Sequence, residues 1–144
     1  MLDMKQLQVV GAIIEYQGKI LCMQRNKGKY SYTSYKFEFP GGKVEEGEDG
    51  PTALMRELRE EMAMEVSISE KDYVTSVFYQ YPDFAITMRC YLCKPLTDRF
   101  VRKEHISSVW LEPEKLDTLD WAAADIPVMR EVMLLFAGEG KEHA

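Results

Sequence analysis

The chain has 144 residues, of which 46% are apolar and 29% are charged. That length suits one compact domain, and the composition excludes the disordered, collagen-like and coiled-coil classes. The formal net charge of −6 argues against a protein that binds nucleic-acid polymers through their phosphates, which requires a basic face. We therefore predict a single globular domain over residues 1–144.

Three features bear on the cellular compartment. The N-terminal residues Met1–Gln6 lack the apolar stretch of a signal peptide. The longest apolar run, Val9–Ile14, is far shorter than the roughly 20 residues that span a membrane. The 3 cysteines are an odd number, which excludes a full disulfide framework. We expect a cytoplasmic protein that does not enter the membrane.

The first elements in chain order form a predicted β-hairpin. Gln8–Glu15 and Lys19–Arg25 are short, apolar and partly β-branched, and Gly18 between them can adopt a positive φ. The polar segment Asn26–Ser34 has no periodic pattern and is predicted to be a loop. Tyr35–Phe39 then alternates polar and aromatic side chains, which predicts a further strand.

A turn and a helix follow. Pro40-Gly41-Gly42 is expected to end the strand in a glycine turn. Pro51–Met62 has proline at the first helical position and good helix formers behind it, which predicts about three helical turns.

The second half of the chain is predicted to contain more strands and a closing helix. β-Branched and aromatic residues favour strands at Tyr73–Tyr79, Ala85–Cys93 and Ile106–Leu111. An apolar stripe predicts a final helix, Pro127–Ala137, which Gly138 is expected to stop. Helices packed on several strands indicate the α/β class, as a sandwich with a mixed β-sheet.

Cys90 and Cys93 form a C-x-x-C pattern within one of these predicted strands. A metal or redox pair would need both sulfur atoms on the same side, whereas a separation of three residues places them on opposite faces of a strand. We therefore expect both to be buried core residues.

Three glutamates share one face of the first predicted helix. At 100° per residue, Glu57, Glu60 and Glu61 fall within an arc of about 100°. Like charges at this spacing repel one another, and a hard divalent cation that accepts several carboxylate oxygens would relieve the repulsion. Mg²⁺ is the expected ion, with Mn²⁺ as the alternative. A solvated face with ordinary salt bridges, such as one to Arg56, would need no metal.

The residues around this face carry a family motif. Gly42, Glu48 and the run Arg56-Glu57-Leu58-Arg59-Glu60-Glu61-Met62-Ala63-Met64 resemble the Nudix box, GX5EX7REUXEEXGU, where U is a bulky aliphatic residue. All the fixed residues of the box match except one. Ala63 replaces a glycine, which predicts either a cost of about 1 kcal/mol for a left-handed helix end or a shifted end. The acidic residues of the box are intact.

The resemblance implies a Nudix-type α/β/α sandwich and a Nudix hydrolase activity. In that reaction, metal-activated water attacks a phosphoanhydride bond of a nucleoside triphosphate and releases a nucleoside monophosphate and pyrophosphate. Glu48 and Arg56 are expected to form a structural brace. The metal ligands that the resemblance implies are Glu57, Glu60, Glu61 and the carbonyl oxygen of Gly41.

The resemblance leaves the general base open between two carboxylates. Glu57 is one candidate, and Glu104, in the polar stretch Asp98–His105, is the other because the MutT-like branch has a loop glutamate in this place. Glu104 could equally be a solvated loop acid. Glu60 is expected to be essential for turnover, and His105 is expected to be an ordinary surface histidine.

The likeness extends beyond the box through Lys19–Arg25, Phe37–Val44, Trp110 and Ala123–Pro127. Together these segments resemble the MutT branch, and within it the CTP pyrophosphohydrolase subgroup. The implied substrates are CTP, dCTP or modified cytosine nucleotides. Hydrolysis of 8-oxo-dGTP is the alternative within the same chemistry, and a non-catalytic nucleotide-sensing module is the alternative outside it.

Two residues are implied at the substrate itself, Arg25 and Asp125. Asp125 could form a hydrogen bond to the base, or it could cap the helix that begins near Pro127. Both monomer and homodimer are compatible with the sequence. An aromatic cluster either stacks on the base or, as we prefer, packs in the core; it consists of Phe78, Tyr79, Tyr81 and Phe84.

Overall fold

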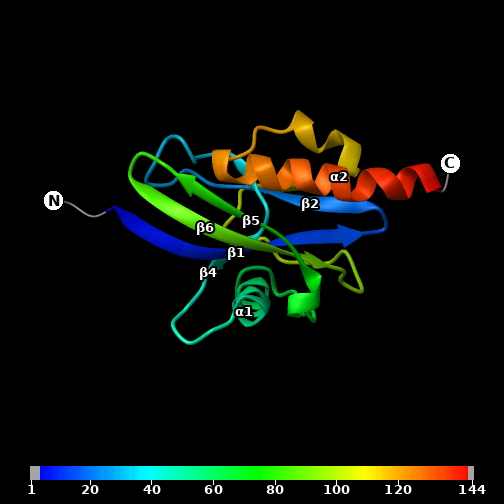
Figure 1. Cartoon of the computed structure of the whole chain (residues 1–144), viewed down its shortest axis with the longest axis horizontal. Helices are drawn as coiled ribbons and strands as arrows, with labels where there is room; N and C mark the ends of the chain where they lie inside the picture. Colours follow the sequence, from blue (N-terminus) through cyan, green and yellow to red (C-terminus); the bar gives the residue numbers. More distant parts are fainter. Residues whose placement is uncertain (1–3, 143–144) are drawn as a thin grey trace.

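The computed structural model describes residues 4–142 of the chain. Within them, one mixed sheet is flanked by two α-helices and by short 3₁₀ turns (Figure 1). The strands are β1 (Lys5–Tyr16), β2 (Lys19–Gln24), β3 (Phe37–Glu38), β4 (Gly41–Lys43), β5 (Tyr73–Gln80), β6 (Phe84–Cys93) and β7 (Ser107–Leu111), and the helices are α1 (Gly50–Met62) and α2 (Ile126–Glu142).

The sheet has the strand order β3-β2-β1-β6-β5, with β4 paired to β1 and β7 paired to β2. β1 and β6 run parallel from the pair Lys5 and Phe84 to the pair Ile14 and Cys93, whereas the other pairings are antiparallel. Helices α1 and α2 lie on opposite sides of this sheet (Figure 1). The predicted α/β sandwich with a mixed sheet is therefore confirmed.

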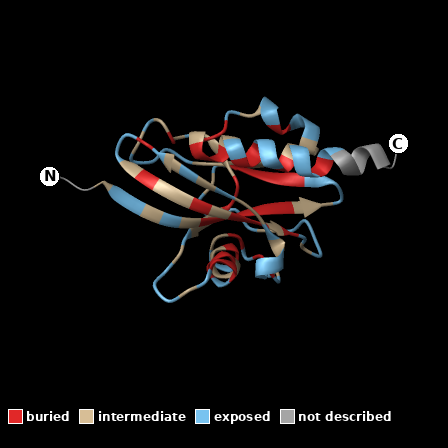
Figure 2. Cartoon of the chain, in the orientation of Figure 1, coloured by how far each residue is buried: buried red, intermediate tan, exposed pale blue. Residues whose placement is uncertain are grey.

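Each helix closes its own apolar core against the sheet. Leu54, Leu58 and Met62 of α1 pack on one face, where they are at most 1% exposed. Val128 and Val132 of α2 pack on the other. Buried positions follow the inward side of both helices in Figure 2. Burial of apolar surface on both faces holds the sheet between the helices.

The two cysteines of the C-x-x-C pattern lie in different cores. Cys93 belongs to the core beneath α1 and Cys90 to the core beneath α2. Both are buried and unbonded, and burial raises the pKa of the Cys93 thiol to about 12. The prediction that the two sulfur atoms occupy opposite faces as core residues is confirmed.

The predicted hairpin is present and its turn is tight. Glu15 pairs with Ile20 and Tyr16 with Lys19, so only Gln17 and Gly18 form the connection. Their φ angles are 51° and 81°. Positive φ at both central residues is the requirement of a type I′ turn, whose twist matches that of paired strands.

Three predicted boundaries are wrong. Tyr35 has a φ of 65° and lies in a turn, so the strand predicted over Tyr35–Phe39 shrinks to β3. The predicted glycine turn is instead strand β4, in which a Cβ on Gly41 would lie 1.9 Å from the carbonyl oxygen of Val10. Glycine here permits close backbone approach. Helix α2 continues past Gly138, which a helix tolerates at a cost of about 1 kcal/mol.

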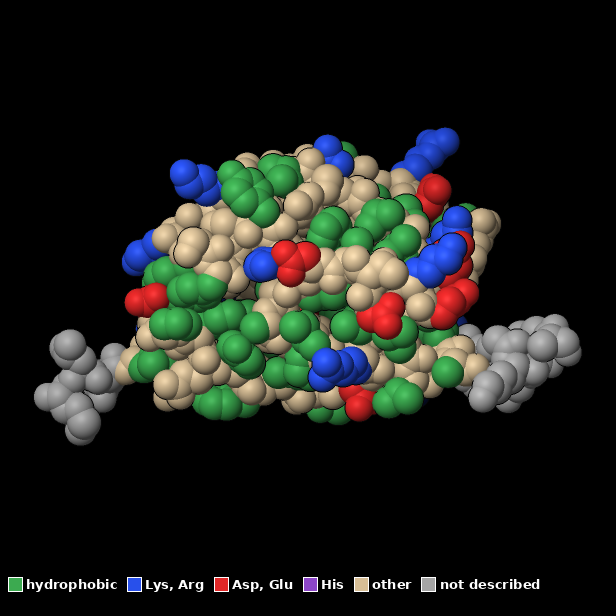
Figure 3. Space-filling model, turned by 90° about the horizontal axis from the view of Figure 1, so that it is seen from above, with side chains coloured by type: hydrophobic (Ala, Val, Ile, Leu, Met, Phe, Trp, Pro, Cys, Tyr) green, Lys and Arg blue, Asp and Glu red, His purple; other side chains and the backbone are tan. Residues whose placement is uncertain are grey.

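Charged side chains are mixed on the face shown in Figure 3, where basic and acidic groups are scattered among broad apolar areas. None of the helices within residues 4–142 is long and apolar enough to cross a membrane.

Candidate active site

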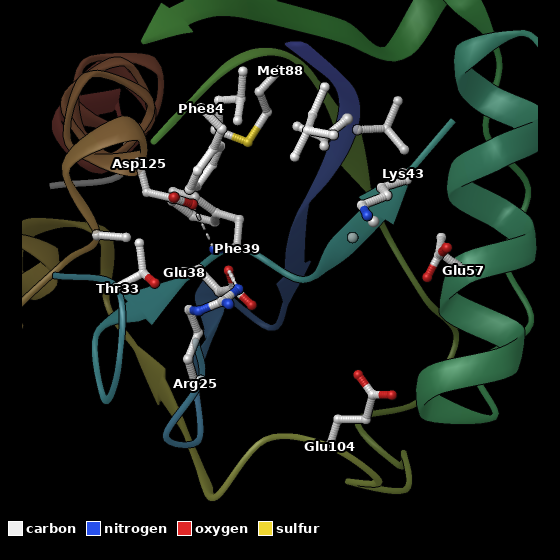
Figure 4. Close-up of a pocket in the computed structure, with 18 of the residues that line it drawn as sticks. Arg25, Thr33, Glu38, Phe39, Lys43, Glu57, Phe84, Met88, Glu104 and Asp125 are labelled. Atoms are coloured by element: carbon white, nitrogen blue, oxygen red, sulfur yellow. Dashed lines mark hydrogen bonds and ion pairs between the residues drawn. The ribbon is translucent and has the colours of Figure 1, made fainter. Parts of the chain in front are cut away.

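A cleft of about 980 Å³ collects residues from distant parts of the chain. Figure 4 shows Glu57 on α1 across the cavity from Phe84 and Asp125. We call the part lined by Glu57, Glu61 and Glu104 the acidic end, and the part lined by Thr33, Phe84, Met88 and Asp125 the Asp125 end.

The caps of α1 fix the direction of its acidic face. At the start, the Asp49 side chain accepts a hydrogen bond of 2.8 Å from the backbone N–H of Thr52, as an N-cap residue does. At the end, Ala63 has φ 52° and ψ 35°, and its N–H donates to the carbonyl of Arg59 at 3.1 Å. The helix thus ends in a left-handed residue although that residue is alanine.

Strand β4 approaches the helix closely at Gly42. A Cβ on Gly42 would lie 2.3 Å from the carboxyl carbon of Glu57, well inside any real contact distance. Because position 42 has no side chain, the Glu57 carboxyl group fits against the backbone of β4. The motif therefore requires glycine at position 42 for a steric reason: a larger residue there would collide with the carboxyl group of Glu57.

Arg56 connects the helix to the segment before it. Its Nε and Nη2 donate to the two carboxylate oxygens of Glu48 at 2.7 and 2.9 Å, a bidentate ion pair. Nη1 donates to Glu57 at 3.0 Å and to Glu60 at 3.2 Å, and Nη2 also donates to the carbonyl of Lys43. The hydrogen bonds that Glu48 accepts from Arg56, and next the one from the backbone N–H of Glu45, lower the pKa of Glu48 to about 2.

Carboxyl groups at the acidic end disfavour one another's charge. Burial raises the pKa of Glu57, against the hydrogen bond from Arg56, and the charges of Glu60 and Glu104 add to the rise. Burial also raises the pKa of Glu61, and the carboxyl group of Glu104 is the next cause. The excess negative charge favours a cation.

Not every predicted ligand lines the cleft. Gly41, Glu57 and Glu61 do, together with Glu104. The Glu60 side chain is 57% exposed and paired with Arg56. Glu60 is absent from the lining of the cleft, so in this arrangement it lies beside the acidic end.

The donor set fits a hard divalent cation because all its side-chain donors are carboxylate oxygens with unbalanced charge. Among the side chains that the structure describes, no three acidic, histidine or cysteine groups stand close enough to hold an ion as they are placed. The carboxylates would therefore have to close around a bound ion.

Asp125 is buried at the opposite end, with 5% of its surface exposed. Its Oδ2 accepts a hydrogen bond of 3.0 Å from the backbone N–H of Phe39. Among the described residues, no N–H in the first turn of α2 donates to it, so the bond to Phe39, the residue after β3, takes the place of helix capping. Burial, followed by the charge of Glu38, raises the pKa of Asp125 well above its usual range.

A polar chain links the two ends. Arg25 Nη1 donates to Glu38 at 3.1 Å, and Nε2 of His105 lies 2.8 Å from the other carboxylate oxygen of Glu38. All three side chains line the cleft. The expectation that His105 is an ordinary surface residue is wrong, because its side chain is 14% exposed and bonded.

The aromatic cluster separates into different roles. Phe78 is 64% exposed, so its predicted place in the core is wrong. Tyr81 is buried, and its hydroxyl oxygen accepts a hydrogen bond from the N–H of Ala124 at 2.9 Å. Phe84 lines the Asp125 end. Lining residues that the sequence did not indicate include Thr33, Lys43 and Met88; they come from separate segments and share no motif.

The NUDIX domain model matches residues 4–132. The chain belongs to the Nudix family. Within this family it is a MutT-like Nudix hydrolase, as the segments outside the box predicted. A CTP pyrophosphohydrolase of Escherichia coli (strain K12) is 38% identical over 134 residues, covering 93% of this chain and 96% of the relative.

Two further comparisons bear on the Nudix fold and branch. An 8-oxo-dGTP diphosphatase of the same E. coli strain is 30% identical over 135 residues, covering 92% of this chain and 100% of that one. The solution structure of the E. coli ORF135 protein superposes with a TM-score of 0.79 at 36% identity, covering 94% of each chain. The Nudix family generally uses a divalent metal, and its substrates include nucleotides.

Proposed function

We propose that this Nudix hydrolase cleaves nucleoside triphosphates to a nucleoside monophosphate and pyrophosphate, with CTP, dCTP or modified cytosine nucleotides as substrates. The observation that carries the proposal is the cleft itself. It has three carboxyl groups at its acidic end and a buried, hydrogen-bonding Asp125 beside Phe84 at the other. Such a cleft suits a ligand with a polyphosphate at one end and a flat polar base at the other.

Mg²⁺ is the proposed ion at the acidic end, with Mn²⁺ able to replace it. Glu60, Glu61 and the carbonyl of Gly41 would hold it, together with whichever of Glu57 and Glu104 does not act as the base. When bound, the ion would screen the repulsion between these acids and the triphosphate and would polarise its phosphorus–oxygen bonds.

The chain's own groups would handle the water and the proton. The oxygen of a water molecule forms a new bond to one phosphorus of the cleaved phosphoanhydride, the bond between that phosphorus and the bridging oxygen breaks, and its electron pair stays on the departing phosphate group. Glu57 is the proposed base that takes the proton of the water, because Gly42 gives its carboxyl group room against β4 and burial raises its pKa. Glu104 is the alternative base.

The substrate preference rests on the 38% identical relative, which is named as a CTP pyrophosphohydrolase. In our proposal Asp125 forms a hydrogen bond to the base, and Arg25 lies beside the bound nucleotide. The second candidate is 8-oxo-dGTP, which the 30% identical relative supports. A non-catalytic sensing module is disfavoured because every glutamate of the box is present.

A product screen with Mg²⁺ tests the proposal. CTP, dCTP, 5-hydroxy-dCTP, 8-oxo-dGTP, ADP-ribose and a dinucleoside polyphosphate are compared by release of monophosphate and pyrophosphate. We expect the highest kcat/KM among the cytosine nucleotides. Release of pyrophosphate from none of the triphosphates would refute the proposed reaction. A clear preference for 8-oxo-dGTP would replace the cytosine nucleotides as the proposed substrate.

In the same assay Glu60→Gln is expected to abolish turnover; near-normal activity of this variant would remove Glu60 from the site.

A further inference from the structure

Glu104 lies on a segment without regular secondary structure, between the end of β6 at Cys93 and the start of β7 at Ser107. No strand pairing fixes such a segment, so its position depends on individual contacts. The neighbouring charges also oppose its position, because Glu104 disfavours the ionised forms of Glu57 and Glu61. Specific contacts must therefore hold Glu104 at the acidic end.

The first set of contacts joins this segment to the end of α1. The backbone N–H of Val101 donates to the carbonyl of Met62 at 2.8 Å, and Nζ of Lys103 donates to the carbonyl of Glu60 at 2.8 Å. Carbonyls in the last turn of a helix lack partners within the helix, and a lysine placed there also interacts favourably with the helix dipole. Lys103 thus attaches the segment beside the acidic face.

The second set of contacts joins the segment to the sheet on the other side of Glu104. His105 bonds Glu38 of β3 at 2.8 Å, and the backbone N–H of Ile106 donates to the carbonyl of Gln24 at 3.0 Å. Glu38 is itself held by Arg25. Residues 103 and 105, the immediate neighbours of Glu104, are therefore fixed to different elements, one to α1 and one to β3.

We propose that Lys103 and His105 are positioning residues that hold Glu104 against the acidic face of α1. The inference rests on the proposed function, in which Glu104 acts at the metal or on the water. Through Glu38, His105 also connects the acidic end to β3, and the N–H of Phe39, the residue that follows this strand, binds Asp125. Neither Lys103 nor His105 needs to touch the substrate for this role.

A double-mutant cycle tests the proposal. Lys103→Met and His105→Ala are made in the wild type and in Glu104→Gln, and Arg102→Met is the control because it removes an equal charge from the adjacent exposed residue. Three quantities are measured at one pH: kcat and KM for the best triphosphate, and the dissociation constant of Mn²⁺ without nucleotide. Each variant must first show a cooperative thermal transition.

In the wild-type background, we expect each positioning variant to lower kcat roughly tenfold, with KM little changed, because a small displacement of a catalytic group is costly. Mn²⁺ should bind several-fold more weakly. In the Glu104→Gln background neither change should lower kcat or weaken Mn²⁺ binding further, since the residue they position is already disabled. His105→Gln, whose amide can still donate to Glu38, should recover most of the activity.

Equal losses in both backgrounds would overturn the proposal, and so would an Arg102→Met variant that matches Lys103→Met. If the wild type hydrolyses no triphosphate, the proposed function fails, but the Mn²⁺ measurements still decide the inference. Coupling of Lys103 and His105 to Glu104 in Mn²⁺ binding would then support it, and additive effects would reject it.

Discussion

At the scale of single residues, Ala63 has an unfavourable conformation for its type. Its φ of 52° brings Cβ close to the following carbonyl, which glycine avoids. The cap is nevertheless formed, with N–H donors from Ala63 and Met64 bonded to the carbonyls of Arg59 and Leu58. The contacts of the helix end therefore fix a geometry that the side chain at position 63 disfavours.

We predict that Ala63→Gly raises the free energy of unfolding by about 1 kcal/mol, because it removes this strain. Ala63→Val is the matched opposite, since a β-branched residue at positive φ should lower stability. We expect the free energy of unfolding, measured with a denaturant, to decrease in the order Ala63→Gly, wild type, Ala63→Val. A destabilised Ala63→Gly would mean that the added freedom of glycine in the unfolded chain outweighs the strain relieved.

Gly41 and Gly42 are adjacent but should respond differently to substitution. Gly42→Ala meets the movable carboxyl group of Glu57, so we expect the fold to survive while turnover falls at least tenfold, since Glu57 is displaced. Gly41→Ala meets the backbone of β1 at Val10, which cannot move without breaking strand pairing, so thermal stability should fall first. Melting temperatures and kcat of both variants separate the two effects, and equal melting temperatures would contradict the assignment.

At the scale of elements, one arginine joins three segments. Arg56 of α1 bonds Glu48 in the preceding loop and the carbonyl of Lys43 in β4. The same guanidinium group bonds Glu57 and Glu60. The brace therefore sets the distance between helix and strand, and it orients part of the acidic face.

The ion pair of Glu48 and Arg56 should make stability depend on pH. The pKa of Glu48 is lowered from 4.5 to about 2, so the unfolded chain binds more protons between these values. Its contribution is fully present above about pH 4.5 and is lost as pH falls toward 2. We predict that Glu48→Gln is less stable than the wild type at pH 7 and that the difference shrinks below pH 4.5. Thermal unfolding of both proteins across this range measures it, and a constant difference would exclude the ion pair as its cause.

At the scale of the whole molecule, the contiguous motif and the distant contacts differ in how well the sequence predicts them. Gly42, Glu48 and the glutamates of α1 lie within one short stretch, and helical periodicity alone places the acids on one face. His105 bonds Glu38 from 67 residues away, and nothing in either local pattern indicates the pair. Strand β2 brings them together, because it pairs with β3 at Glu38 and with β7 from Ser107, two residues after His105.

The predicted boundaries of strands and helices are wrong where packing between elements overrides the local preference of the sequence. The Pro-Gly-Gly sequence is typical of a turn, yet Gly41 and Gly42 form β4 because the absence of side chains lets it approach both β1 and Glu57. A helix cap was one of two roles predicted for Asp125, yet its carboxyl group accepts a hydrogen bond from Phe39, directly after β3. These are contacts between elements, which a single sequence does not specify.

The distribution of charge leads to a last prediction, about metal and stability together. In a chain of net charge −6, Glu57, Glu61 and Glu104 crowd one end of a cleft that must also accept a polyphosphate. Without a divalent ion their repulsion opposes folding. Glu61→Gln should therefore make the metal-free protein more stable by roughly 0.5 kcal/mol, as expected for removing a like-charge pair.

With Mg²⁺ present, the wild type should instead be more stable than Glu61→Gln. An ion that binds only the folded state stabilises it by about 2.7 kcal/mol at one hundred times its dissociation constant, and Glu61→Gln should lose most of that gain because it loses a ligand. Melting temperatures with EDTA, with Mg²⁺ and with NaCl at matched ionic strength measure the two effects, since NaCl only screens the repulsion. Equal gains from Mg²⁺ and NaCl would show that these carboxylates form no specific metal site.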